Sequence, residues 1–239
     1  MNENAKLAKS CTLLLISFPL LALLMFVFSI KQTVASGTPI VLDISGNGKI
    51  DITGHTTTRQ KLYTLFSIEQ YVKFDIFNRG EMSQIDWIAP DTDAFLIDLR
   101  EGHPSGNLTG KHLFGTAGFS SNSDDEGFEF ENGFEKLATL DLNQDGKLSG
   151  DELTGLALWK DDGDALFEPN EHVKLSDHKI VSISVTFEKS SGAYGAPKLT
   201  SEATTESSSS IYVEDIWFMT PNDVARYDRI FGRFFAALR

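Results

Sequence analysis

An uninterrupted apolar run near the N-terminus divides this chain into two parts. Residues 11–30 contain no charged side chain, whereas Lys6 and Lys9 precede the run and Lys31 follows it. Such a run either spans a bilayer as a retained anchor or is the core of a cleaved signal peptide, with a cleavage site among the small residues near position 35. Because the more basic flank stays in the cytoplasm, both alternatives make residues 1–36 a targeting segment. We therefore expect an exported body over residues 37–239, secreted, periplasmic or anchored to the inner membrane.

The exported body is strongly acidic. Residues 37–239 hold 18 basic and 33 acidic side chains, a net charge of −15. Such a body repels the phosphate backbone of nucleic acids and attracts cations. The single cysteine, Cys11, lies in the apolar run. The body can therefore form no internal disulfide, iron–sulfur cluster or Cys-ligated zinc site.

The residue pattern of the body predicts an α+β fold built from short strands and hairpins. Alternating or β-branched runs predict strands at residues 40–44, 71–76, 94–99, 180–187 and 211–219. Phe134, Leu137 and Leu140 are spaced for a short helix, and a second helix is expected over residues 153–159. The Ser- and Thr-rich segment 190–210 is typical of a mobile loop. Thr220 and Pro221 begin an amphipathic C-terminal helix over residues 220–239.

One segment of twelve residues, 141–152, carries the most specific chemical signal. Calcium takes six to eight oxygen ligands, and an EF-hand loop supplies them from positions 1, 3, 5, 7, 9 and 12 with glycine at position 6. Gly146 stands at position 6, and Ser149 at position 9 would hold a ligand water. The predicted calcium ligands are Asp141, Asn143, Asp145, the backbone carbonyl of Lys147, and Glu152. Flanking helices on both sides would complete an EF-hand helix-loop-helix.

Three other acidic segments match this pattern less well. The loop that begins at Asp43 keeps oxygens at positions 1, 3, 5 and 9, but its position 12 is Gly54, so a weakened calcium site and a plain turn remain alternatives. Residues 75–80 keep only the first ligand and the glycine, and Arg79 would repel a cation. In residues 161–171, a loop ending at Glu171 has Ala165 in place of glycine, which favours a solvated acidic loop over a distorted site.

The order of these motifs resembles a known family. Val41-Leu42-Asp43, Phe74-Asp75, Leu96-Ile97-Asp98-Leu99 and Leu113-Phe114-Gly115 precede the 141–152 loop, and Leu158-Trp159-Lys160-Asp161 and Ile216-Trp217-Phe218 follow it. Together they resemble the bacterial EF-hand-containing domain of exported proteins, some of them associated with haemolysin-type (RTX) calcium-binding repeats. The resemblance implies calcium binding at the positions that match. The glycine-rich nonapeptide repeats themselves are absent from the sequence.

Two other functions are alternatives to calcium binding. No nucleophile elbow, phosphate-binding loop or metal-ligand spacing of the five histidines supports catalysis, so we expect no enzyme. The C-terminal helix would place Arg226, Arg229 and Arg233 beside an apolar face. Such a helix either docks on the core or binds an anionic membrane or a partner protein. The leading expectation is an exported protein that binds Ca²⁺ through one intact EF-hand loop, and the alternative is an interaction module in which calcium is incidental.

Overall fold

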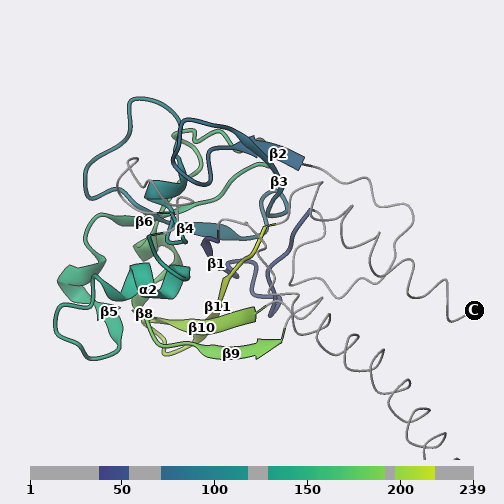
Figure 1. Cartoon of the computed structure of the whole chain (residues 1–239). Coiled ribbons are helices and arrows are strands. Elements are labelled where there is room, and N and C mark those ends of the chain that lie inside the picture. Colours follow the sequence, from purple (N-terminus) through teal and green to yellow (C-terminus); the bar gives the residue numbers. More distant parts are fainter. Residues whose placement is uncertain (1–37, 54–70, 118–128, 192–196, 219–239) are drawn as a thin grey trace, which may run out of the picture. The chain divides into compact units, whose positions relative to one another are not determined.

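The described part of the chain is built mainly from β-strands. The computed structural model describes residues 38–53, 71–117, 129–191 and 197–218 (Figure 1). Nine antiparallel strands form one sheet in the order β5-β8-β10-β11-β1-β4-β6-β7, with β9 paired to β10. These strands are β1 (Ile40–Leu42), β4 (Ala94–Asp98), β5 (Lys147–Ser149), β6 (Leu156–Trp159), β7 (His172–Lys174), β8 (Ile180–Ser184), β9 (Glu188–Ser191), β10 (Pro197–Thr205) and β11 (Ser210–Asp215).

A two-stranded sheet and a few short helical segments complete the described fold. Strands β2 (Tyr71–Phe74) and β3 (Ser83–Asp86) pair with each other. One α-helix, α2 (Gly133–Ala138), and three 3₁₀ turns, η1 (Gly110–His112), η2 (Gly150–Leu153) and η3 (Leu175–His178), lie within the described residues. The side chain of Asn132 caps α2 by accepting a hydrogen bond from the Glu135 N–H at 3.0 Å.

The middle of the sheet is buried on both faces. In β4, Ala94 and Leu96 point into one cluster of buried residues, whereas Phe95 and Ile97 point into a second cluster. This division follows from the two-residue period of a strand. The second group, which we call the aromatic cluster, contains the contacting rings of Phe74, Trp87, Phe95, Trp159 and Phe218. Two apolar faces explain why the central strands are almost continuously hydrophobic.

Several predicted elements are confirmed. Residues 40–44, 71–76, 94–99, 180–187 and 211–219 each contain a strand, respectively β1, β2, β4, β8 and β11. The helix predicted over Phe134 and Leu137 is α2, and both side chains are buried. Local periodicity therefore predicted the type of these elements correctly, although the structural boundaries are shorter.

The predicted α+β fold with an EF-hand helix-loop-helix is wrong. The segment expected to be the second helix, residues 153–159, contains the end of η2 and strand β6. All four residues of β6 are buried, and they pair with β4 on one side and β7 on the other. An apolar run this short fits a buried strand or a helix equally well, so its two strand neighbours decide. The 141–152 loop is thus entered from a helix but left through a 3₁₀ turn and a strand.

The prediction of a mobile loop over residues 190–210 is also wrong for the described residues. Strand β10 runs through this segment and pairs with β8, β9 and β11. Leu199 and Ala203 of this strand are buried. Threonine is β-branched and suits a pleated, half-buried surface, so a composition typical of linkers is compatible with a strand once partners flank it.

Two predicted segments lie outside the described residues. These are the targeting segment, residues 1–36, and the C-terminal helix at residues 220–239. Within the described ranges, no helix has the length and apolar character needed to cross a membrane.

Candidate metal centre

The predicted calcium loop, residues 141–152, folds back on its first residue. The carboxylate of Asp141 accepts hydrogen bonds from the backbone N–H groups of Asp145 at 3.2 Å and Gly146 at 2.9 Å. Gly146 has a φ of +86°, a left-handed conformation that favours glycine. The sharp turn that was expected at position 6 of the loop is therefore present.

Glu152 closes the same loop from its other end. Its Oε1 atom accepts the N–H of Leu142 at 3.0 Å, and its Oε2 atom accepts the N–H of Ser149 at 3.1 Å. Position 12 of the loop thus contacts position 2. Between them, Leu148 of β5 is fully buried and pairs with Ile183 of β8. The loop is consequently closed by side chains and fixed to the sheet through one apolar residue.

The five predicted ligands lie in this closed loop, but their carboxylates do not form a tight cluster. The side chains of Asn143 and Asp145 are exposed, and each accepts a backbone N–H within the loop, from Asp145 at 2.8 Å and from Lys147 at 3.1 Å. Each carboxylate oxygen of Asp141 accepts one hydrogen bond. A carboxylate oxygen has about two lone pairs, so this loop retains acceptor capacity for a cation.

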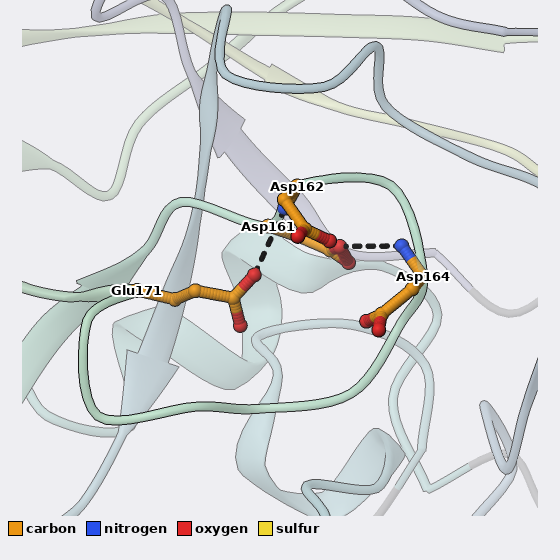
Figure 2. Close-up of side chains that lie close together, drawn as sticks. All are labelled: Asp161, Asp162, Asp164 and Glu171. Atoms are coloured by element: carbon orange, nitrogen blue, oxygen red, sulfur yellow. Dashed lines mark hydrogen bonds between the residues drawn. The ribbon is translucent and has the colours of Figure 1, made fainter.

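A tighter acidic cluster occurs in the next loop, between β6 and β7. Figure 2 shows Asp161, Asp162, Asp164 and Glu171 around one space, and one oxygen from each lies within 4.8 Å of the others. Asp161 and Glu171 are buried, whereas Asp162 and Asp164 are exposed. Only this loop places four acidic side chains so close together within the described part of the chain.

The aromatic cluster holds the two buried acids of this loop in place. The indole N–H of Trp87 donates to Asp161 Oδ2 at 2.7 Å, and the indole N–H of Trp159 donates to Glu171 Oε2 at 3.0 Å. Hydrogen bonds of this kind replace the water that a buried carboxylate loses. The fold therefore uses two core tryptophans to position two acids at the base of the loop.

Backbone N–H groups complete the hydrogen bonding of these acids. Asp161 accepts from Gly163, Asp164 and Ala165, while Glu171 accepts from Asp162 and Glu168. Figure 2 shows the bonds from Asp164 to Asp161 and from Asp162 to Glu171. Burial raises the pKa of Asp161 to about 6, and the hydrogen bonds from Gly163, Trp87 and Ala165 oppose this effect. Since Asp161 already accepts several donors, its main role is to hold the loop, and the free acceptor capacity belongs to Asp162, Asp164 and Glu171.

Counting along the sequence favoured a solvated loop over a metal site here for a local reason. A twelve-residue frame ending at Glu171 begins at Lys160, and a frame beginning at Asp161 is one residue short. In the structure the loop is closed by Asp161 and Glu171 themselves, and Ala165 adopts a φ of +59° at the turn. The high density of acidic residues between two strands was the available signal, but it does not fit the twelve-residue spacing of an EF-hand loop.

The same aspartate-anchored turn occurs at the two other candidate loops. Asp43 accepts hydrogen bonds from the N–H groups of Gly46 and Gly48, and Asp75 accepts from those of Arg79 and Gly80. An aspartate side chain that bonds to backbone N–H groups a few residues ahead stabilises a turn by itself. The Asp-to-Gly spacing is therefore explained by turn formation whether or not a cation binds.

Comparison with known proteins identifies the family. A protein-family model described as the SPM domain matches residues 40–219, well over half of the 239 residues. This chain belongs to the SPM domain family. The matched range begins at β1 and includes the four aspartate-anchored loops of the SPM domain, which begin at Asp43, Asp75, Asp141 and Asp161. A search of curated proteins finds no match for the chain. The resemblance to EF-hand-containing domains stays a prediction.

Proposed function

We propose that this SPM domain binds Ca²⁺ at the loop of residues 141–152. The ligands are Asp141, Asn143, Asp145, the Lys147 carbonyl and Glu152, as the residue spacing predicts. The observation that carries the proposal is the contact of Glu152 with the N–H of Leu142, because it closes the loop between its last ligand and the residue that follows its first ligand. A 3₁₀ turn and a strand replace the exiting helix of an EF-hand, so the proposal concerns the loop and not the EF-hand fold.

The donor set of this loop fits a hard divalent cation. All the proposed ligand atoms are oxygens, and Asp141, Asp145 and Glu152 contribute three negative charges. Calcium binds such ligands, whereas zinc favours nitrogen and sulfur. The side chain of Lys147 is exposed, so its charge lies in solvent while its carbonyl remains in the loop.

A second calcium site is proposed at Asp162, Asp164 and Glu171, with Asp161 as a positioning residue. Calcium–oxygen distances are about 2.3–2.6 Å, so ligand oxygens on opposite sides of one ion lie about 4.6–5.2 Å apart. The mutual separation of 4.8 Å or less in this cluster agrees with that value. Lys160, the basic residue next to Asp161 in the sequence, pairs instead with Asp91 at 3.7 Å.

The role we propose for calcium is to stabilise the folded body outside the cytoplasm. Extracellular calcium modules have dissociation constants of about 10⁻⁴–10⁻³ M. An ion present at ten times its dissociation constant adds about 1.4 kcal/mol to the free energy of unfolding of a protein that binds it only when folded. Calcium then serves as a permanent structural element of an exported protein and not as a signal.

Calorimetric titration of the calcium-free, full-length protein in detergent tests both sites. We expect heat of binding for the wild type, loss of one event in Glu152→Gln, and retention of that event in Asp151→Asn, which removes the same charge one residue away. Asp164→Asn should remove a different event. A wild type without binding heat and without a calcium-dependent rise in Tm would refute calcium binding. Equal titrations of Glu152→Gln and the wild type would refute the 141–152 site.

A further inference from the structure

A buried aspartate outside the loops described so far faces the loop that begins at Asp43. Asp93 precedes β4 and is fully buried. Its Oδ2 atom accepts the backbone N–H of Asp51 at 2.6 Å, whereas its Oδ1 atom has no hydrogen-bond partner in the described structure. A buried carboxylate oxygen without a partner is costly and calls for an explanation.

Strand register places Asp93 beside the first residue of that loop. In the antiparallel pair of β1 and β4, Val41 lies opposite Phe95 and Leu42 lies opposite Ala94. The next pair in the same register is Asp43 with Asp93. Residues directly opposite each other in such a pair have Cα atoms about 4.5–5.5 Å apart. Two acids that are 50 positions apart in the sequence are thereby neighbours.

The far end of the loop is fixed to the same region. Ile52 forms a bridge with Ile88, and the N–H of Thr53 donates to the carbonyl of Trp87 at 2.8 Å. Because of this pairing, the loop that begins at Asp43 ends with Asp51 next to Asp93. Asp93 thus has the backbone of Asp51 on one side and, by strand register, Asp43 on the other. Three acids therefore face one another across a fixed loop.

We propose that Asp93 completes a calcium site with Asp43, Asn47, the Lys49 carbonyl and Asp51. The loop has ligand oxygens at positions 1, 5, 7 and 9 but lacks the acid of position 12, where Gly54 stands. Asp93 supplies that acid from a different strand, and its Oδ1 atom is the oxygen that a cation would satisfy. This site shares the calcium chemistry of the proposed function but none of its residues.

The ion pair between Lys49 and Asp51 must open for this site to fill. The side chain of Asp51 forms an ion pair with Lys49 and accepts a hydrogen bond from the Asn47 amide. The Lys49 side chain is 65% exposed, so it can turn into solvent without leaving a buried charge. Lys49 therefore competes with a cation for Asp51, which makes the affinity depend on this lysine.

The test isolates this site in the full-length protein that already carries Glu152→Gln and Asp164→Asn. Calcium titration should show one remaining binding event and a calcium-dependent rise in Tm. Adding Asp93→Asn should abolish both, whereas Asp91→Asn, an exposed aspartate two residues away, should leave them unchanged. A purely structural Asp93 would instead change Tm by the same amount with and without calcium.

A second variant keeps the proposal testable if Asp93→Asn fails to fold. Exposed ion pairs contribute about 0.2–1 kcal/mol, so Lys49→Met should tighten calcium binding about 1.4- to fivefold, while Lys73→Met on β2 should not. If the variant with Glu152→Gln and Asp164→Asn shows no calcium binding, this site does not exist. The same conclusion follows if adding Asp93→Asn leaves calcium binding unchanged. The proposed function is tested separately, because loss of one binding event from the wild type to Glu152→Gln would support the 141–152 site even if the Asp93 site does not exist.

Discussion

At the scale of single residues, an aspartate organises each acidic loop before any cation is considered. Asp161 shows this most clearly, because it accepts the indole N–H of Trp87 and the backbone N–H groups of three following residues. Hydrogen bonds to charged acceptors contribute more than neutral ones, and a donor left unsatisfied in the interior is costly. The negative charge of Asp161 therefore stabilises the loop even though burial disfavours it.

The first prediction concerns Asp161→Asn. The new amide group would face donors that now bind a carboxylate oxygen, so we expect the free energy of unfolding to fall by about 2–3 kcal/mol. Urea denaturation in calcium-free buffer measures this change. Asp162→Asn is the matched control, because Asp162 is exposed and should change the value by less than about 0.5 kcal/mol. Equal effects of the two changes would contradict the structural role of Asp161.

At the scale of elements, β5 is the short strand that joins the 141–152 loop to the main sheet. It has three residues, and only Leu148 is buried, opposite Ile183 of β8. The loop therefore depends on one apolar side chain for its position relative to the sheet. The loop is thus fixed by the pairing of β5 with β8, and it is left through η2 and β6 where an EF-hand would have its exiting helix.

The second prediction follows from that anchor. Leu148→Ala should lower the free energy of unfolding by about 2–5 kcal/mol, because a fully buried leucine leaves a cavity when truncated. It should also weaken calcium binding at the loop, which calorimetry would detect. Leu142→Ala makes the same substitution in the same loop at a side chain that is 82% exposed, and little change is expected. Comparable losses in both variants would show that β5 does not fix the loop.

At the scale of the whole molecule, burial of acids makes the calcium-free protein sensitive to pH. Asp215, at the end of β11, is fully buried and accepts the backbone N–H of Gly133 at 3.0 Å. Burial raises the pKa of Asp215 to about 7 from the ordinary value of 3.8. Because the folded state then holds a proton that the unfolded state releases, this aspartate stabilises the fold less as pH rises from about 4 to about 7.

The third prediction is the resulting pH profile. In calcium-free buffer, the free energy of unfolding of the wild type should fall between pH 5 and pH 7 by up to about 1.4 kcal/mol per pH unit from this one group. Asp215→Asn should flatten the profile, and Asp151→Asn, which changes an exposed side chain, should not. Urea denaturation across this pH range provides the measurement. A wild-type stability that increases from pH 5 to pH 7 would contradict this assignment.

Much of the β-sheet could be predicted from the sequence because burial on one or two faces leaves a local pattern. The alternation in β8 and the apolar runs of β1 and β4 are visible within a few residues. The segments that form β6 and β10 were mispredicted because their residues suit two conformations, and strand neighbours from elsewhere in the chain selected one. Propensity is a weak guide where tertiary pairing supplies most of the stabilisation.

The candidate sites divide in the same way. The sequence by itself determined an acidic body and a twelve-residue loop with calcium-ligand spacing at Asp141 and Glu152, since those ligands are close along the chain. Only the tertiary structure placed Asp93 beside Asp43, and two core tryptophans beside Asp161 and Glu171. The physical reason is that strand register and core packing join residues far apart in sequence, and no local spacing records which distant acid will complete a loop.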